Sequence, residues 1–267
     1  MNYLQFFGFT SEPYSSEIAT KHLMKLNSIL EIKNRFEYVF NCGGVFVLTG
    51  DVGSGKSTAL RFTESQFHPS QYHFINILAS GGSIIEFYRQ LCWGVDIEMI
   101  SGTRTTALKK FKSAVFETST TKKQKIIVVI DEAHLLRPEI FNELHIINQF
   151  KHDSQNIFSI ALVGQANLID KLTYRTSAAL ASRVITRTHI AHLSEIEVAA
   201  YIEHRLHISG VKTQIFSPQA IVAIYQGSGG ILRRINLLAR GGLIAAASEK
   251  QNIVSSEHIR LASSELI

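Results

Sequence analysis

The chain has 267 residues, of which 45% are hydrophobic and 18% are charged. This length allows one large domain or a medium-sized domain with a small one, and either can bury a full core. The composition excludes a disordered or collagen-like chain, and no apolar run approaches the ~18 residues that a membrane helix needs. Two isolated cysteines offer neither a disulfide framework nor metal-ligand spacing, so we expect a cytoplasmic protein. Because no apolar run is long enough for a membrane helix, we expect no membrane partner. The net charge of +5 permits an anionic partner such as nucleic acid without requiring one.

Apolar periodicity predicts alternating strands and helices over about the first 190 residues. An aromatic, turn-rich arm over 1–20 precedes a helix over 22–40. Short apolar runs at 45–48, 126–130 and 158–163 are typical of buried strands, and two further strands are expected at 72–78 and 183–190. Helices are expected between them over 56–67, 84–93 and 138–151, and a basic helix at 108–112 is expected between two polar loops. This alternation predicts an α/β fold, with a parallel five-stranded sheet sandwiched by helices.

The pattern changes to helices alone after His192. A capping box of Ser194 and Glu197 begins one helix. Further helical patterns begin at Ser217 and cover 231–248 and 255–264. We therefore expect two domains: an aromatic arm with an α/β nucleotide-binding domain over 1–192, and a small helical lid domain over 193–267.

A glycine-rich loop follows the first predicted strand. Residues 50–57 read GDVGSGKS and fit the pattern G-x-x-x-x-G-K-[ST] between a strand and a helix. Such a loop can wrap a phosphate chain with its N–H groups pointing inward, and the helix N-terminus adds a favourable dipole. Lys56 is placed to reach the β- and γ-phosphates, and the Ser57 hydroxyl to bind Mg²⁺. The predicted nucleotide-binding residues are Gly50, Asp51, Val52, Gly53, Ser54, Gly55, Lys56, Ser57 and Thr58.

Two carboxylates follow the third predicted strand. Ligands bind at the carboxyl ends of the strands in an open parallel sheet, so we expect Asp131 to face the Mg²⁺ held by Ser57. Glu132 is placed to activate a water for attack on the γ-phosphate of ATP. Asp131-Glu132-Ala133-His134 also matches a helicase signature, but such helicases need a second nucleotide-handling domain, for which too few residues follow. We therefore interpret His134 as a residue at the start of a helix.

At this point the chain resembles an AAA+ ATPase of the ExeA-like subfamily, the general secretion pathway protein A type. The same module is similar to transposition regulators of the TnsC and TniB kind. The resemblance covers nearly the whole chain. Besides the two motifs above, it rests on the aromatic pattern of Tyr3, 6–9 and Pro13-Tyr14, on Leu162-Val163-Gly164-Gln165, and on Gly229-Gly230 followed by Arg233 and 235–238. It implies a P-loop fold with a helical lid and ATP and Mg²⁺ as cofactors.

The resemblance also implies catalytic roles. Gln165 matches the first sensor, which contacts the γ-phosphate or the attacking water. Arg183 matches the arginine finger supplied to a neighbouring subunit, where it neutralises charge on the transferring phosphoryl group; Arg187 is the alternative finger. Arg233 matches the second sensor, which reaches the nucleotide from the lid. The family usually has proline just before this arginine, whereas here the residue is leucine and Arg234 follows, so both arginines stay candidates.

The aromatic arm has two interpretations. As the resemblance implies, Phe9 and Tyr14 border the adenine. Alternatively, they pack as part of the core.

A basic segment covers 101–125, where seven lysines and arginines accompany the single acid Glu117. In the transposition regulators this part of the module faces the pore of a ring or filament. The resemblance therefore makes Thr103, Arg104 and Thr105 candidate contacts to the backbone of double-stranded DNA. A solvated helix face is the alternative interpretation.

We expect an ATP hydrolase that assembles with copies of itself into a ring or helical filament, hexameric arrangements included. The first hypothesis is a transposition regulator on double-stranded DNA, with a transposase or target-selection protein as partner. The alternative is an ATPase of a secretion or cell-envelope assembly system. Because full secretion members carry a membrane segment and a further domain that these 267 residues lack, the first hypothesis is preferred from the sequence.

Overall fold

The computed structural model describes residues 2–99, 101–149 and 157–264. Contacts divide the chain into two compact units, an α/β unit and a helical unit. The α/β unit consists of Leu26–Asp51 and Lys56–Ile190. The helical unit consists of the residues up to Lys25, the short segment Val52–Gly55 and the residues from Ala191 onward. Each unit has its own buried apolar core.

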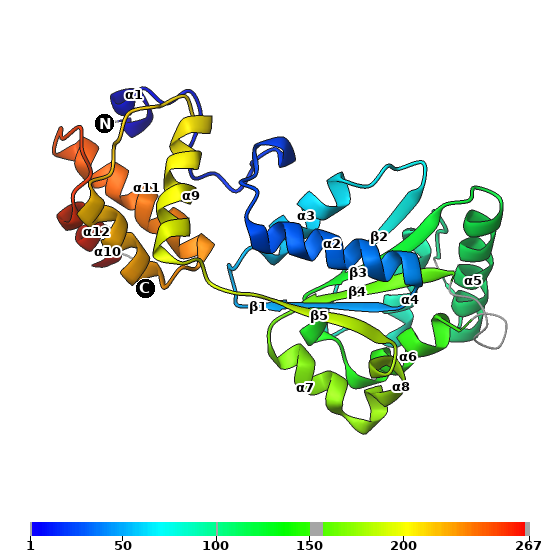
Figure 1. Ribbon diagram of the computed structural model, residues 1–267. Coiled ribbons are helices and arrows are strands. Elements are labelled where there is room, and N and C mark those ends of the chain that lie inside the picture. The colour runs from blue at the N-terminus through cyan, green and yellow to red at the C-terminus, as the bar shows by residue number, and fades with distance from the viewer. Residues whose placement is uncertain (1, 100, 150–156, 265–267) are drawn as a thin grey trace. The chain divides into compact units, whose positions relative to one another are not determined.

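The α/β unit is built on five parallel strands in the order β2-β3-β4-β1-β5 (Figure 1). The strands are β1 Val45–Gly50, β2 Tyr72–Leu78, β3 Lys125–Asp131, β4 Phe158–Gly164 and β5 Val184–Ile190. The expected parallel five-stranded sheet is thus confirmed. β4 lies between β1 and β3, where Gly164 pairs with Thr49 of β1 and Leu162 pairs with Ile130 of β3. The carboxyl ends of β1, β4 and β3 are therefore neighbours at one edge of the sheet.

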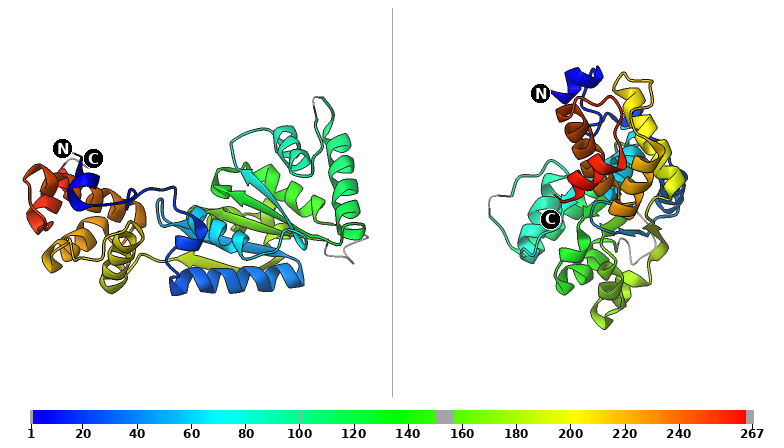
Figure 2. Two further views of the ribbon diagram at one scale, coloured as in Figure 1. Left: turned by 90° about the horizontal axis from the view of Figure 1, so that it is seen from above. Right: turned by 90° about the vertical axis from the view of Figure 1, so that its left-hand side faces the viewer.

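Helices cover both faces of this sheet (Figures 1 and 2). One face carries α2 and α3, and the other carries α4 to α8. Their bounds are α2 Asn27–Cys42, α3 Lys56–Ser65, α4 Ile84–Trp93, α5 Arg104–Thr120, α6 Pro138–Ile147, α7 Asn167–Thr173 and α8 Ala178–Ala181. Every residue of β1 and β4 is buried, because a strand inside such a sandwich has apolar neighbours on both faces.

Two helix boundaries differ from the sequence expectation. The helix expected over 22–40 begins only at Asn27, because Leu23 and Leu26 have extended backbones. Both leucines are nevertheless buried, so their spacing imitates a helical face. The helix expected over 138–151 ends at Ile147, where polar Asn148 and Gln149 interrupt the apolar pattern. Lys151, the expected end, lies outside the described residues.

The basic helix is much longer than expected. α5 runs over Arg104–Thr120 and includes most of the two stretches that were expected to be polar loops. Thr103 caps its start by accepting a hydrogen bond from the amide of Thr106. Ala107, Phe111 and Val115 bury one face of it in the core. The short helices α7 and α8 were not expected, since seven and four residues give too little periodicity to detect.

The helical unit contains α1 Tyr3–Phe7, α9 Glu195–Ile208, α10 Pro218–Ser228, α11 Leu232–Ser248 and α12 Ser256–Ser264. The expected capping box is confirmed, since Ser194 accepts from the amide of Glu197 and the Glu197 carboxylate accepts from the amide of Ser194. Ser217 caps α10 by accepting a hydrogen bond from the amide of Ala220, with Pro218 at the first position of the helix. The helices expected after His192 are therefore all present.

The aromatic arm packs on the helical unit, with α1 against α11 (Figure 2). Buried Arg205 of α9 donates hydrogen bonds to the carbonyls of Pro13 at 2.5 Å and Ser15 at 2.6 Å. Its guanidinium lies over the rings of Tyr14 and Tyr201, 6.0 and 5.7 Å from their centroids. Such contacts combine hydrogen bonding with cation–π attraction.

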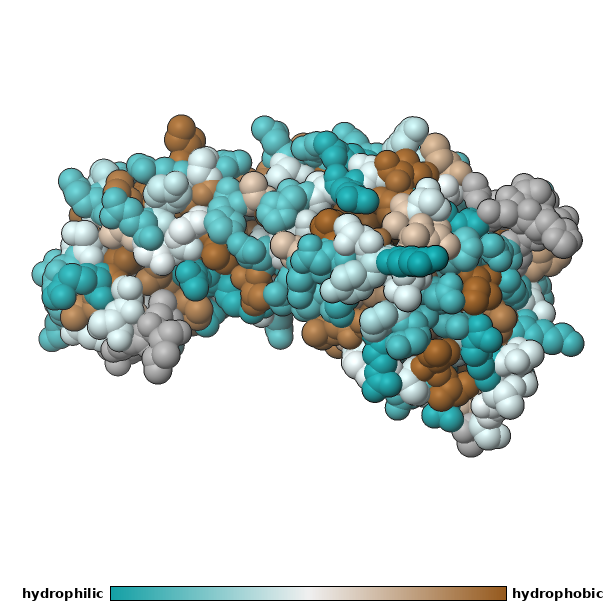
Figure 3. All heavy atoms as spheres, turned by 90° about the horizontal axis from the view of Figure 1, so that it is seen from below, coloured by the Kyte–Doolittle hydropathy of each residue, from teal (hydrophilic) through white to brown (hydrophobic). Residues whose placement is uncertain are grey.

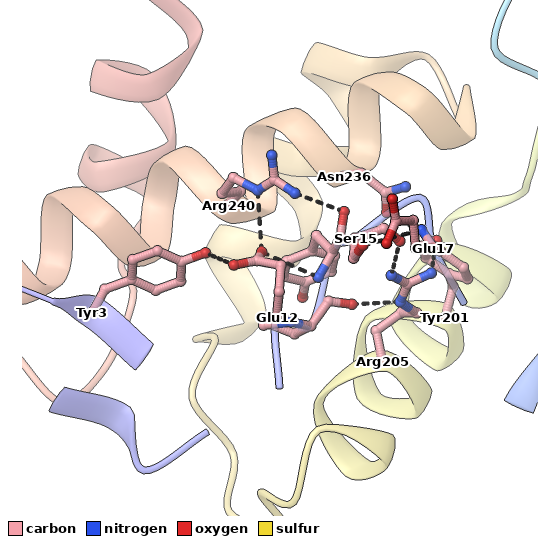
Figure 4. Close-up of polar contacts among 10 residues, drawn as sticks. Tyr3, Glu12, Ser15, Glu17, Tyr201, Arg205, Asn236 and Arg240 are labelled. Carbon is pink, nitrogen blue, oxygen red and sulfur yellow. Dashed lines mark hydrogen bonds and ion pairs between the residues drawn. The ribbon is translucent and has the colours of Figure 1, made fainter. Parts of the chain in front are cut away.

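A second arginine fixes the same arm. Arg240 of α11 donates to Glu12 Oε1 at 3.1 Å and to the carbonyl of Tyr14 at 2.9 Å, and the Tyr3 hydroxyl donates to Glu12 (Figure 4). The Tyr14 ring is 2% exposed and packs edge-on against Phe216. These contacts group the arm with the helical unit, whereas the expected 1–192 domain placed it with the strands. They also account for Tyr14 as a core residue of the helical unit.

No helix among the described residues is long and apolar enough to cross a membrane. On the face drawn in Figure 3, apolar surface occurs in small separate patches between hydrophilic side chains.

Candidate active site

The phosphate loop follows the carboxyl end of β1. The buried strand ends at Gly50, five loop residues follow, and α3 begins at Lys56. Gly53 has a φ of +82°, a conformation that residues with a Cβ rarely adopt. A strand, a glycine turn and a helix start are thus arranged as the sequence motif predicts, with the first amides of α3 at the loop.

The Lys56 side chain is held inside this loop. It is only 6% exposed, and its Nζ donates to the carbonyls of Gly50 and Asp51, both at 2.9 Å. Ser54 Oγ is also buried and has no hydrogen-bond partner among the described residues. A buried hydroxyl without a partner is costly unless a ligand satisfies it. The loop therefore fits a phosphate chain, with a fixed ammonium group and a hydroxyl available to it.

The two sequence motifs meet at the edge of the sheet. Ser57 Oγ, in the first turn of α3, donates to Oδ2 of Asp131, the last residue of β3, at 2.9 Å. A hydroxyl and a carboxylate are the oxygen ligands that Mg²⁺ prefers. This pair fits the predicted Mg²⁺ site, and its members would hold the ion beside the phosphate loop.

Glu132 follows in an unusual backbone conformation, with φ 54° and ψ 31°. A non-glycine residue in this left-handed region costs of order 1 kcal/mol, and such residues cluster at functional sites. Its amide donates to Asp131 Oδ1 at 2.9 Å, which helps to fix the turn. The Glu132 side chain is 38% exposed, so water can reach its carboxylate.

Gln165 comes directly after β4 and lies between the ends of β1 and β3. Its amide donates to Nδ1 of His134 at 3.3 Å. His134 is 7% exposed and also lies 3.3 Å from Glu132 Oε2 through the same Nδ1 atom. The sequence interpretation of His134 as a helix-start residue placed it in the correct 3₁₀ turn, Ala133–Leu135. It missed the contact with Glu132 in the same turn, and the contact with Gln165, which depends on β4 lying beside β3.

The candidate arginine finger lies at the opposite edge of the sheet. Arg183 precedes β5, and its carbonyl accepts from the amide of Val45 at the start of β1. Its Nε donates to His145 Nδ1 of α6 at 3.3 Å. Arg187 is an exposed residue within β5, opposite Val47 in the middle of β1. Neither arginine is at the carboxyl ends of the strands, where the phosphate loop is.

Of the two candidate second-sensor arginines, Arg233 contacts the phosphate-loop backbone. Its amide donates to the carbonyl of Gly53 at 3.1 Å, and both residues belong to the helical unit. A Cβ on Gly53 would lie 2.6 Å from the Cβ of Arg233, so only glycine allows this approach. Arg234 has no such contact with Val52–Gly55 among the described hydrogen bonds. This difference favours Arg233 for the predicted role.

The candidate DNA-contact residues are at the start of α5. Thr103 is the N-cap, and Arg104 forms a two-pronged ion pair with buried Glu143 of α6, at 2.8 and 2.9 Å. Glu143 raises the pKa of Arg104 through this hydrogen bond, and it also accepts from the hydroxyl of Tyr88 at 2.6 Å. Thr105 is exposed. The geometry thus gives Arg104 a structural role that the sequence did not reveal.

The sheet order, the phosphate loop and the Ser57–Asp131 pair define a P-loop AAA+ fold. Residues 42–172 match the family model described as an AAA domain. The chain is 29% identical over 268 residues to general secretion pathway protein A of Aeromonas hydrophila, a match that covers 99% of this chain and 48% of that protein. The chain thus spans about half the length of this curated relative. The similarity confirms the resemblance to ExeA-like AAA+ ATPases, whereas closeness to the TnsC and TniB regulators stays a prediction.

Solved structures show the same fold at low sequence identity. Cdc6p from Pyrobaculum aerophilum has a TM-score of 0.75 at 14% identity, covering 96% of this chain and 70% of that one. The ORC1 protein of Aeropyrum pernix, solved in complex with DNA, has a TM-score of 0.70 at 14% identity, covering 95% of this chain and 68% of that one. The RuvB Holliday junction branch migration motor of Thermotoga maritima has a TM-score of 0.56 at 15% identity, covering 98% of this chain and 74% of that one. At these identities the likeness establishes the fold alone.

Proposed function

We propose that this protein is an ATP hydrolase that depends on Mg²⁺. The observation that carries the proposal is the 2.9 Å contact between Ser57 Oγ and Asp131 Oδ2, beside a loop that holds the Lys56 ammonium group. Two oxygen ligands and a fixed cation at the end of β1 match what a nucleoside triphosphate and its ion require.

The roles of the remaining residues follow from their positions. Bound Mg²⁺ would offset charge on the β- and γ-phosphates. Lys56 would bind the same phosphates. Glu132 would accept a proton from the attacking water while the water oxygen bonds to the γ-phosphorus and the bond from that phosphorus to the bridging oxygen breaks, so that ADP leaves. Gln165, between the loop and Asp131, would orient the γ-phosphate or that water. Arg233 is proposed as the second sensor.

We further propose that active copies of the chain assemble side by side. Arg183 lies at the edge of the sheet opposite the phosphate loop of its own chain, so a finger role requires a second copy. A cation delivered to a developing phosphoryl charge is worth several kcal/mol in related chemistry, which makes hydrolysis depend on assembly. A ring or helical filament would supply one Arg183 to each site.

Two biological processes are candidates. The similarity to general secretion pathway protein A favours an ATPase of a secretion or cell-envelope assembly system. A role on double-stranded DNA is supported by the ORC1 neighbour, which was solved in complex with DNA, and by the exposed lysines Lys109, Lys110, Lys122 and Lys123. Transposition, with a transposase as partner, is the more specific form of the second candidate.

Hydrolysis is tested by phosphate release with and without Mg²⁺, using Ser57→Ala and a control variant on the same helix, Ser65→Ala. Ser65 Oγ donates to the carbonyl of Phe62 and accepts from Nε2 of Gln66, both outside the phosphate loop, so its loss should leave turnover unchanged. Mg²⁺-dependent turnover in the wild type, weakened in Ser57→Ala alone, supports the proposal. Wild-type protein that binds ATP but releases no phosphate under any assembly condition contradicts it.

A further inference from the structure

One ring nitrogen of His134 faces two groups of the candidate active site. Nδ1 accepts a hydrogen bond from the backbone amide of Gln165 and lies 3.3 Å from Oε2 of Glu132. The ring is buried against β4, since a Cβ on Gly164 would lie only 3.1 Å from the amide nitrogen and the Nδ1 atom of His134. The proposed general base and the proposed sensor are therefore joined through a single atom.

An imidazole Nδ1 can serve only one of these groups at a time. When it accepts from the Gln165 amide, it carries no proton, and in the neutral ring the proton is on Nε2. Its lone pair then offers no hydrogen bond to the Glu132 carboxylate. When the proton is on Nδ1 instead, the ring donates to Glu132, and the Gln165 amide loses its acceptor.

We propose that His134 is a positioning residue that couples the orientation of Glu132 to the position of Gln165. When the backbone amide of Gln165 is hydrogen-bonded to the His134 ring, Glu132 is released toward the attacking water. With the ring bound to Glu132, the carboxylate is held back and the end of β4 is free to shift. A change at Gln165 on contact with the γ-phosphate is thereby transmitted to the base. This inference rests on the proposed ATP hydrolysis and adds a residue to it.

Two features support coupling over simple packing. Glu132 has a left-handed backbone that is stabilised locally by its hydrogen bond to Asp131 Oδ1, so a small change in its side-chain partner can redirect the carboxylate. His134 also donates or accepts through Nδ1 on the side that faces the sheet edge, whereas a packing residue would need no polar atom there. Buried polar groups without such a role are costly.

Steady-state ATP hydrolysis by substituted proteins tests the coupling. His134→Leu keeps an apolar side chain of similar bulk but removes Nδ1, and we expect kcat to fall about tenfold to a hundredfold. The KM for ATP should stay within about twofold of wild type, because His134 touches no residue of the phosphate loop in the described contacts. His134→Asn places an amide oxygen near the position of Nδ1, so it should recover much of the lost kcat.

Two controls separate coupling from general loss of a buried histidine. His258 is 3% exposed and hydrogen-bonds Ser255 and Glu249 in the helical unit. His258→Leu should lower the melting temperature without selectively lowering kcat. In a Glu132→Gln background, His134→Leu should have little further effect on the residual rate, because its action passes through Glu132.

The outcomes distinguish a failure of the His134 coupling from a failure of the proposed ATP hydrolysis. Wild-type kcat in His134→Leu overturns the coupling, as does an effect that is undiminished in the Glu132→Gln background. Absence of turnover in the wild type, or wild-type turnover in both Glu132→Gln and Lys56→Ala, overturns the proposed hydrolysis instead. If His134→Leu fails to fold, the ring ¹⁵N shifts of wild-type His134 decide: a change in the protonation of Nδ1 between nucleotide-free and ATP-bound protein supports the inference, and an Nδ1 that stays the same in both contradicts it.

Discussion

The hydroxyl of Ser57 donates a hydrogen bond to Oδ2 of Asp131 across 2.9 Å, although 74 positions separate the two residues in the chain. The contact exists because β3 and β1 end at the same edge of the sheet, separated only by β4. Ser57 is in the first turn of the helix that follows β1, and Asp131 ends β3. The parallel sheet thus brings two distant motifs to one ion-binding position, on which the proposed hydrolysis depends.

Lys56→Ala should lose most nucleotide affinity. The ammonium group is prepositioned by the carbonyls of Gly50 and Asp51, and its removal leaves phosphate charge uncompensated. A hydrogen bond between charged groups contributes about 1.5–3 kcal/mol, so the Kd should rise by about tenfold or more. Titration with a fluorescent ATP analogue measures this. Lys171→Ala is the matched control, because that lysine also donates to a backbone carbonyl, at Leu136, which is not part of the phosphate loop.

Glu132→Gln should bind ATP and Mg²⁺ normally yet hydrolyse slowly. The amide keeps the shape of the side chain but cannot accept the proton of the attacking water, a contribution of about 10²–10⁴-fold. Single-turnover phosphate release measures the chemical step directly. Turnover within a few-fold of wild type would remove Glu132 from the role of base.

The sequence predicts the sheet, the phosphate loop and the acidic pair after β3, because each of these depends on a local sequence pattern. Buried parallel strands are continuous apolar runs, and the loop residues 50–57 are contiguous. The ion pair of Arg104 with Glu143 could not be predicted, since it depends on how α5 and α6 pack. The same holds for His134, whose contact with Gln165 arises only because β4 is inserted between β1 and β3.

The aromatic arm shows a further limit of sequence reasoning. Its aromatic residues were correctly expected to be ordered, but the pattern could not show which unit they join. That choice depends on Arg205 and Arg240, which lie about 190 and 230 positions away and bind backbone carbonyls of the arm. Carbonyl groups are the same in every sequence, so such contacts leave no motif.

Arg183→Ala should bind ATP but hydrolyse poorly, because in the proposed assembly each site receives its arginine finger from a neighbouring copy. Mixing it with Lys56→Ala, which has an intact Arg183, should restore part of the activity at mixed interfaces. Phosphate release is measured across mixing ratios, together with the mass of the assemblies. Arg187→Ala is the comparison variant, and the arginine whose loss can be complemented is the finger. Hetero-assemblies whose rates never exceed the sum of the separate proteins would contradict a shared site.

Arg104→Ala should destabilise the α/β unit. Glu143 is 5% exposed and would remain buried without its cation, with only the Tyr88 hydroxyl as a partner in the described contacts. Leaving a buried charged acceptor incompletely paired costs about 1–3 kcal/mol. Urea unfolding measures the loss, and Glu143→Gln with Arg104→Ala should recover part of it by removing the charge. Equal stability of wild type and Arg104→Ala would show that the ion pair is energetically neutral.

Lys109→Ala with Lys110→Ala separates the two candidate processes. Both lysines are exposed on α5, whereas Lys112 is half-buried, donates to the carbonyl of Gln149 and has a pKa lowered by burial. If the chain acts on DNA, ATP-driven assemblies should bind duplexes of unrelated sequence, because repeated phosphate contacts add along the duplex. The double variant should then weaken binding and flatten its salt dependence by about two units of slope per subunit in contact. Fluorescence anisotropy with ATP, ADP and no nucleotide at several salt concentrations measures both effects. Lys33→Ala, which removes one lysine charge from α2, is the control, to be compared with Lys109→Ala and Lys110→Ala taken singly. Assemblies that form with ATP but bind no duplex at low salt would reject the DNA candidate and leave the secretion or cell-envelope system as the process served.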